Sequence, residues 1–183
     1  LFGDEFDKIS PYINERVKYE IDRRIFKPFL SGSEMPWMGY KGHVVNNWVP
    51  WIISNCIPAA HIFADGVTKV TLMQKFMGVL DRFIAEYKPD GGCDEGPGYW
   101  NAAGASLFDA LEILYSISNG KIDVYSEPLI KNIGKYIMHA HLFDRIFINF
   151  ADGSPSPVIS AELINRYGRR VNSAPLASFG ARM

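Results

Sequence analysis

The sequence predicts an all-α domain, and three observations lead to this prediction. Apolar residues recur at steps of three and four positions in one segment after another, which is the periodicity of amphipathic helices. Short turns containing glycine, proline or asparagine separate these segments, and strand-like segments do not alternate with them. The 183 residues suit one domain, which we place at 1–183, and they are enough to bury a substantial core. The segments pair into helical hairpins of about forty residues each.

The first predicted helix covers residues 6–29, where apolar side chains recur every four positions. Pro11 falls in its first turns, where proline is tolerated, and the breakers in 28–33 end it. The aromatic segment 34–42, which contains Trp37, is too irregular for a helix or strand. We expect either an aromatic plug over a helix end or a rim that faces a substrate.

The second predicted helix begins after Asn46 and Asn47, either of which can cap it, and has Pro50 in its first turn. It extends to about His61, with a kink expected at Pro58.

The remaining elements are predicted from the same signals of periodicity, capping and breaking. Asp65–Gly66 precedes a helix with two apolar stripes, which indicates packing on both sides. Another helix begins near Tyr99 and ends at Asn119–Gly120. Further helices are predicted from about residue 126, around 160–167 and around 174–181, with a strand or extended edge at 143–150.

Composition and charge exclude several classes of function. The net charge of −1 gives no basic field of the kind nucleic-acid binding requires. No apolar run approaches the roughly 20 residues that a membrane span needs. Two local basic clusters, 18–27 and 166–170, are typical of solvated helix faces and could also attract an acidic polymer.

Cys56 and Cys93 are the two cysteines, and we expect both to be free thiols that lie near each other. Without histidines or further cysteines at ligand spacing, we predict no metal site and no cofactor.

The stretch 89–114 carries the side chains best suited to chemistry. Two glycine-rich breaks, 89–92 and 96–98, enclose Asp94 and Glu95, and Tyr99 and Trp100 follow where the helix begins. A phenol held at such a point can face a cleft. The alternative is that the acidic side chains cap the helix and that both aromatic rings pack beneath the loop.

A second stretch, 46–56, contains two consecutive asparagines, of which helix capping explains only one. Asn47 and Trp51 are four residues apart and therefore share a helix face. The pair suggests a binding role for the amide in addition to the cap.

Together these stretches resemble the heparinase II/III family of polysaccharide lyases and its alginate-lyase relatives. Asp90–Gly91, Glu95 and Tyr99 stand in the order of the family's tyrosine loop, and Asn47 stands where the family has a carboxylate-binding asparagine. The resemblance implies an incomplete α/α toroid and a periplasmic or secreted protein whose export signal lies outside this chain. It also implies a partner domain, a C-terminal β-sandwich outside this chain that supplies a further catalytic histidine, so that the chain alone would be inactive.

The resemblance further implies β-elimination on a uronic-acid-containing polysaccharide, heparin-like or alginate-like. Asn47 would neutralise the carboxylate and Tyr99 would act as acid and base. Substrate-binding side chains would be Asn46, Trp48, Trp51, Glu95 and Trp100.

One position departs from the family pattern. Trp48 occupies the place where relatives often carry a histidine. Either Tyr99 acts alone, or His43 or His61 substitutes.

Two alternatives belong to other functional classes. A glycoside hydrolase on a helical toroid would use Asp94 or Glu95 with another carboxylate. A glycan-binding or scaffolding domain would keep the aromatic cleft without turnover.

Overall fold

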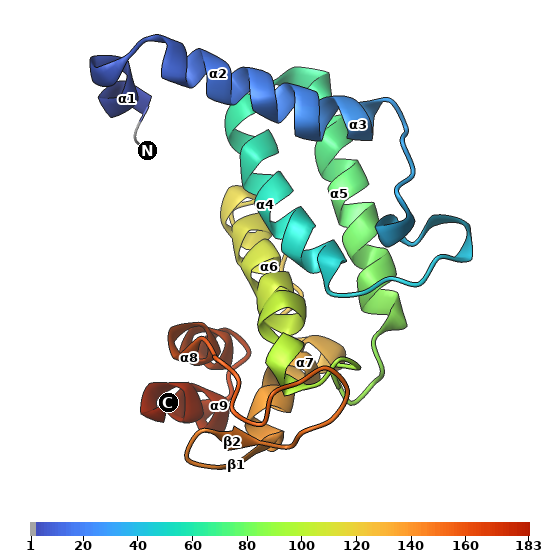
Figure 1. Ribbon diagram of the computed structural model, residues 1–183, viewed down its shortest axis with the longest axis vertical. Coiled ribbons are helices and arrows are strands. Elements are labelled where there is room, and N and C mark those ends of the chain that lie inside the picture. The colour runs from blue at the N-terminus through green and yellow to red at the C-terminus, as the bar shows by residue number, and fades with distance from the viewer. Residues whose placement is uncertain (1–2) are drawn as a thin grey trace.

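The computed structural model describes residues 3–183 and confirms the all-α class (Figure 1). Its α-helices are α1 (Gly3–Ile9), α2 (Tyr12–Ile21), α3 (Lys27–Leu30), α4 (Trp48–Phe63), α5 (Gly66–Glu86), α6 (Ser106–Ile117), α7 (Pro128–His139), α8 (Ala161–Arg170) and α9 (Ala174–Arg182). Strands β1 (His141–Phe143) and β2 (Ile146–Phe147) form a small antiparallel hairpin. This hairpin overlaps the start of the segment 143–150, for which the sequence predicts a strand or an extended edge. No helix among the described residues is long and apolar enough to cross a membrane.

The prediction of one unbroken helix over 6–29 is wrong, because the chain breaks at Ser10–Pro11. The Ser10 N–H donates to the Phe6 carbonyl and makes the last hydrogen bond of α1. The Ser10 carbonyl accepts from the Ile13 N–H, which begins the next turn. From Tyr12 the chain is helical to Leu30, through a π-helical turn at Asp22–Phe26. Since proline has no N–H and restricts the residue before it, a helix starts at Pro11 more easily than it continues through it.

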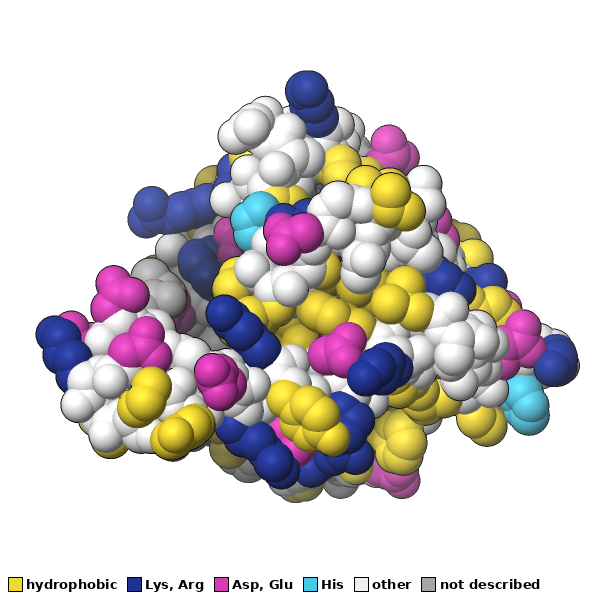
Figure 2. Space-filling view, turned by 90° about the horizontal axis from the view of Figure 1, so that it is seen from above, with side chains coloured by type: hydrophobic (Ala, Val, Ile, Leu, Met, Phe, Trp, Pro, Cys, Tyr) yellow, Lys and Arg dark blue, Asp and Glu magenta, His cyan; other side chains and the backbone are white. Residues whose placement is uncertain are grey.

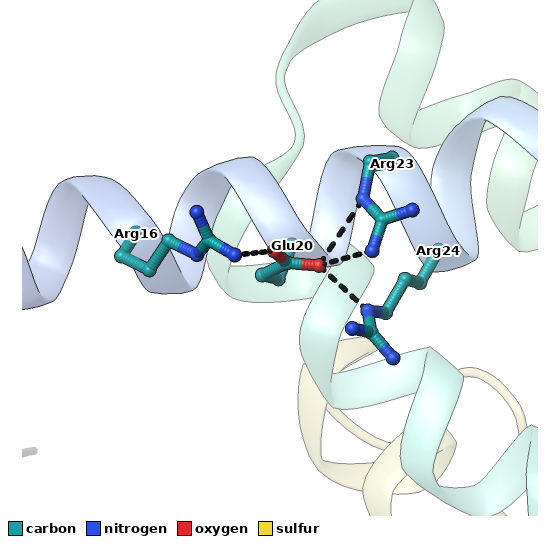
Figure 3. A network of polar contacts seen from close by, with 4 residues as sticks. All are labelled: Arg16, Glu20, Arg23 and Arg24. Atoms are coloured by element: carbon teal, nitrogen blue, oxygen red, sulfur yellow. Dashed lines mark hydrogen bonds and ion pairs between the residues drawn. The ribbon is translucent and has the colours of Figure 1, made fainter.

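The helices α1 and α2 form an arm that projects from the rest of the molecule (Figure 1). Neither of these described helices has a fully buried residue, and Ile9 is 76% exposed although it belongs to the apolar pattern. Glu20 organises the arm's polar face by contacting Arg16, Arg23 and Arg24 (Figure 3). Hydrogen bonds from Arg24 and Arg23 lower the pKa of Glu20 to about 2. The arginines of these ion pairs are exposed, so each pair adds little to stability.

The core lies between α4, α5 and α6. The helices α4 and α6 lie side by side with their N-terminal ends together, while α5 runs in the opposite direction (Figure 1). One predicted stripe of α5 is buried as expected, whereas the other is mostly half-buried and includes the exposed Val70. The α4 helix continues through Pro58 to Phe63. The buried residues at the centre are Val49, Ile53 and Ile57 of α4, Leu72, Phe76 and Val79 of α5, and Leu107 and Phe108 of α6.

The segment 34–42 packs as an aromatic plug. Trp37 lies edge-on against Phe29 with ring centres 6.3 Å apart, and Met38 is buried. Arg82 of α5 lies over the Tyr40 ring at 3.9 Å. These contacts favour the plug over the alternative of a substrate-facing rim.

A C-terminal layer of α7, α8 and α9 closes the lower part of the molecule (Figure 1). Tyr167 of α8 stacks on Phe108 of α6 with ring centres 4.3 Å apart, and its hydroxyl donates to the Ile130 carbonyl at 2.8 Å. This buried tyrosine joins α6, α7 and α8.

Charged side chains of both signs are intermixed on the face seen from above in Figure 2. That distribution agrees with the near-zero net charge.

Candidate functional site

The two stretches singled out in the sequence meet at the N-terminal end of α4. The amide Nδ2 of Asn47 donates a hydrogen bond to Oε2 of Glu95, which joins residues 48 positions apart. Asn47 is only 7% exposed, and its carbonyl Oδ1 is buried without a hydrogen-bond partner among the described residues. An unpaired buried polar atom is costly, which marks this amide as more than a packing residue.

The two adjacent asparagines divide their tasks. The side chain of Asn46 accepts from the Trp48 N–H at 3.0 Å and so caps the start of α4. Asn47 makes no side-chain cap bond, although its carbonyl accepts from the Trp51 N–H. Because Asn46 satisfies the helix end, the Asn47 side chain is available to face Glu95.

The loop that carries Glu95 is fixed by α7 on one side and by the loop around residue 150 on the other. Gly91 lies against the backbone of Asn132 and Ile133, and the Asn132 side chain donates to the Pro89 carbonyl at 2.8 Å. Gly96 has a φ of 88° and leaves no room for a Cβ, which would lie 2.7 Å from a backbone oxygen of residue 150. Only glycine suits such a position.

Asn47 and Glu95 line a hollow of about 650 Å³, counting its open mouth. The enclosed part of this space is about 190 Å³, which is smaller than the roughly 300–1,000 Å³ of typical small-molecule sites. The wall combines apolar groups with several ionisable ones. Its lining residues are Val44, Val45, Asn46, Asn47, Phe83, Glu86, Tyr87, Lys88, Gly92, Cys93, Asp94, Glu95 and Ala103.

The electrostatics of the hollow oppose the ionisation of Glu95. Burial raises the pKa of this carboxyl, the negative charges of Asp152 and Asp94 raise it further, and the hydrogen bond from Asn47 opposes the rise. Burial also raises the pKa of the Cys93 thiol to about 11, which keeps it neutral and a poor nucleophile. Asp152 was not singled out in the sequence, where it marks only a loop.

Tyr99 ends a 3₁₀ turn, Pro97–Tyr99, just before the π-helical turn Asn101–Ala105 that leads into α6. Its side chain is 39% exposed, and it does not line the hollow. The predicted position at the first turn of a helix is confirmed. Glu95 contacts Asn47 and precedes Tyr99 by four residues along the chain.

Two of the predicted stacking residues are exposed and one is not. Trp48 and Trp51 are 54% and 57% exposed, and Trp51 lines a second, shallow hollow between α4 and α6. Trp100 is completely buried, so the prediction that it binds substrate is wrong. Its indole N–H donates to the Ile133 carbonyl at 2.9 Å, and its ring stacks on Tyr167.

The histidines considered as substitutes for the missing family histidine do not line the hollow. His43 is exposed, and the exposed His61 lies about 20 Å along α4 from Asn47.

Cys56 and Cys93 are free thiols, as predicted, and the structure shows that both are buried. No group of three or more histidine, cysteine, aspartate or glutamate side chains within residues 3–183 is placed to hold a metal ion.

Comparison with known proteins adds no further identification: no family model matches the chain, and no curated protein matches it.

Proposed function

We propose that this chain carries the carboxylate-binding and proton-donating part of a polysaccharide lyase that acts on a uronic-acid-containing polysaccharide. The observation that carries the proposal is the buried amide of Asn47 at the wall of a hollow, joined through Glu95 to the turn that bears Tyr99. This arrangement brings a neutral hydrogen-bond donor and a half-exposed phenol to one end of two neighbouring helices.

The fold supports a place for this site in an incomplete α/α toroid. In such a toroid, inner helices run parallel and outer helices return between them. The side-by-side α4 and α6 match inner helices, and the oppositely directed α5 matches an outer one (Figure 1).

The chemistry of β-elimination gives each group a task. The proton at C5 of a uronate is weakly acidic because the neighbouring carboxylate is already charged, and its removal adds further charge. An amide donor at Asn47 would stabilise that charge, and the N-terminal end of α4 would add a partial positive charge. Tyr99 would return a proton to the leaving oxygen.

The proposal leaves part of the reaction to a partner. A histidine from a β-sandwich domain of the kind the resembled family carries would take the C5 proton. The exposed rings of Trp48 and Trp51 would offer stacking surfaces for neighbouring sugar rings. Such a protein would work outside the cytoplasm, where acidic polysaccharides occur.

A glycoside hydrolase is the second candidate, and Glu95 is the observation in its favour. A carboxyl with a raised pKa close to the charges of Asp152 and Asp94 is the pattern of a general acid beside a second carboxylate. Hydrolysis would produce saturated sugars, whereas elimination produces an unsaturated uronate. Binding without turnover, through the exposed tryptophans, would produce neither.

The test is incubation of the full-length protein, including the β-sandwich domain that the proposal requires, with heparin, heparan sulfate, hyaluronan, chondroitin and alginate, with ultraviolet detection of unsaturated uronate. We expect product from at least one polymer, and we expect Tyr99→Phe to reduce its rate by about 10²-fold or more. Tyr19→Phe is the matched control, because Tyr19 is also exposed but lies on the arm. Saturated products would favour the hydrolase, and full activity of Tyr99→Phe would exclude the proposed role of the phenol.

A further inference from the structure

A carboxylate ligand at Asn47 would meet a second carboxylate already in place. Asparagine has two N–H groups, and Asn47 gives one of them to Glu95. Because Asn47 is almost completely buried, an anion that accepts its other N–H must lie close to Glu95. Two carboxylates that share one site cannot both remain ionised without a large cost.

The surroundings of Glu95 do not offset this charge. Asp94 from the same loop and Asp152 from the loop near residue 150 act on Glu95, and Glu86 at the end of α5 lines the same hollow. Lys88 is the one cation among the described lining residues, while Tyr87 and Cys93 are kept neutral by burial. The hollow is already negatively charged, and an added anion would therefore make it more negative.

We propose that binding of a uronate carboxylate beside Asn47 is coupled to the uptake of one proton by Glu95. This inference rests on the proposed function, since it takes a uronate as the ligand. It makes Glu95 a positioning residue that acts on the substrate through Asn47.

The unpaired Oδ1 of Asn47 indicates how the proton would act. Ionised Glu95 can only accept, so it holds the Nδ2 side of the amide and leaves Oδ1 without a partner. Protonated Glu95 can donate to Oδ1 once the amide has turned by half a rotation. Nδ2 then occupies the buried position that Oδ1 holds in the structure, and both of its N–H groups are released from Glu95 for a carboxylate that reaches this position. One proton, taken from solvent, thus satisfies the buried oxygen and releases the amide.

The expected pH dependence follows from this coupling. The bound anion raises the pKa of Glu95, so the complex holds more protons than the free protein. Affinity is therefore highest at low pH and falls as the pH rises through the range between the pKa of Glu95 in the free protein and in the complex. The dissociation constant should increase by up to about tenfold per pH unit in that range.

The experiment is calorimetric titration of the whole chain with sodium glucuronate between pH 5 and 8, in pairs of buffers with different heats of ionisation. We expect the proton uptake to be largest, and close to one proton per ligand, between the pKa of Glu95 in the free protein and its pKa in the complex. Glucose, which lacks the carboxylate, is the ligand control. Glu95→Gln resembles the protonated form, and we expect it to bind glucuronate with little pH dependence and at pH 8 at least as tightly as the unchanged protein. Asp94→Asn, in the same loop, should retain the proton uptake.

The two proposals fail in different ways. Glucuronate binding without proton uptake, uptake that persists in Glu95→Gln, or no binding at any pH would overturn the inference. Formation of unsaturated product in the polysaccharide assay would leave the lyase proposal standing in each of these cases. Proton uptake without any product from the polymers would support the coupling and count against the lyase.

Discussion

Asn46 and Asn47 show how two identical neighbouring side chains acquire different roles from the position of a helix start. The side chain of Asn46 caps the N–H of Trp48, the first residue of α4, whereas Asn47, immediately before this helix, turns its amide to Glu95. The sequence predicts that one asparagine is available beyond the cap. A shift of one residue in the helix start would have exchanged the two roles.

Trp100 and Trp48 provide a matched test of burial against exposure. Trp100→Phe removes the hydrogen bond to the Ile133 carbonyl and leaves a cavity beside Tyr167, so we expect a loss of about 2–3 kcal/mol in the free energy of unfolding. Trp48 is 54% exposed, and Trp48→Phe should change that free energy by less than about 0.5 kcal/mol. Urea denaturation of the two variants measures both values.

For sugar binding we expect the opposite order, with the larger effect at Trp48. If Trp48 contributes a stacking face, Trp48→Ala should weaken oligosaccharide binding without a matching loss of stability. Equal destabilisation by Trp100→Phe and Trp48→Phe would contradict the assignment of Trp100 to the core.

At the scale of elements, α7 supports the site loop although it contributes no residue to the hollow. Gly91 has a φ of 76° and lies against the α7 backbone, and Asn132 of α7 holds the Pro89 carbonyl. The loop position is therefore set by a helix that lies some forty residues further along the chain.

Gly91→Ala should disrupt this support. The added Cβ would overlap the backbone of Asn132 and Ile133 in addition to the strain of a positive φ, so we expect a loss of about 3 kcal/mol or more. Gly32→Ala is the control, because Gly32 has a φ of 77° but open space around it, and it should cost only about 1 kcal/mol. Thermal denaturation compares the two variants, and similar losses would show that the contact with α7 is unimportant.

Most helices could be predicted because their apolar periodicity and breakers agree, as at Asp65–Gly66 before α5 and Asn119–Gly120 after α6. The arm could not be predicted, because its apolar pattern implies burial, whereas neither α1 nor α2 has a fully buried residue in the structure. The hairpin after α7 was ambiguous, because periodicity alone does not separate a short strand from an extended loop.

For the whole molecule, the order of Asn47, Glu95 and Tyr99 along the chain predicted that the segments 46–56 and 89–114 would form the candidate site. The structure joins Asn47 and Glu95 directly by a hydrogen bond. Long-range neighbours could not be predicted in this way. Asp152 acts on Glu95 from a loop 57 positions away, and Trp100 is buried because α8 brings Tyr167 against it. Both depend on how α7, α8 and α9 return to the site loop, which no local pattern encodes.

The same packing makes the stability of the molecule sensitive to alkali. Burial raises the pKa of Cys56 to about 12 and that of Cys93 to about 11, and it raises the pKa of Tyr87 and Tyr167 well above the usual value for tyrosine. In the unfolded chain these groups lose their protons at ordinary values, near pH 9 for a thiol. The folded state holds more protons between those limits. The stability they contribute is complete below pH 9 and is lost as the pH rises towards 11–12.

We therefore expect the free energy of unfolding to be nearly constant from pH 7 to 8.5 and to fall above pH 9, by about 1.4 kcal/mol per pH unit for each thiol that ionises only on unfolding. Urea denaturation at a series of pH values gives this slope. The variant Cys56→Ala/Cys93→Ala removes both thiols, which are half ionised at pH 9 in the unfolded chain, so its decline between pH 9 and 10 should be smaller by about 2 kcal/mol. The buried tyrosines would still ionise on unfolding at higher pH, which leaves part of the decline in place. An unchanged slope in the double variant would mean that the thiols are accessible to solvent in the folded protein, and rapid reaction of the native protein with a thiol reagent at pH 8 would show this independently.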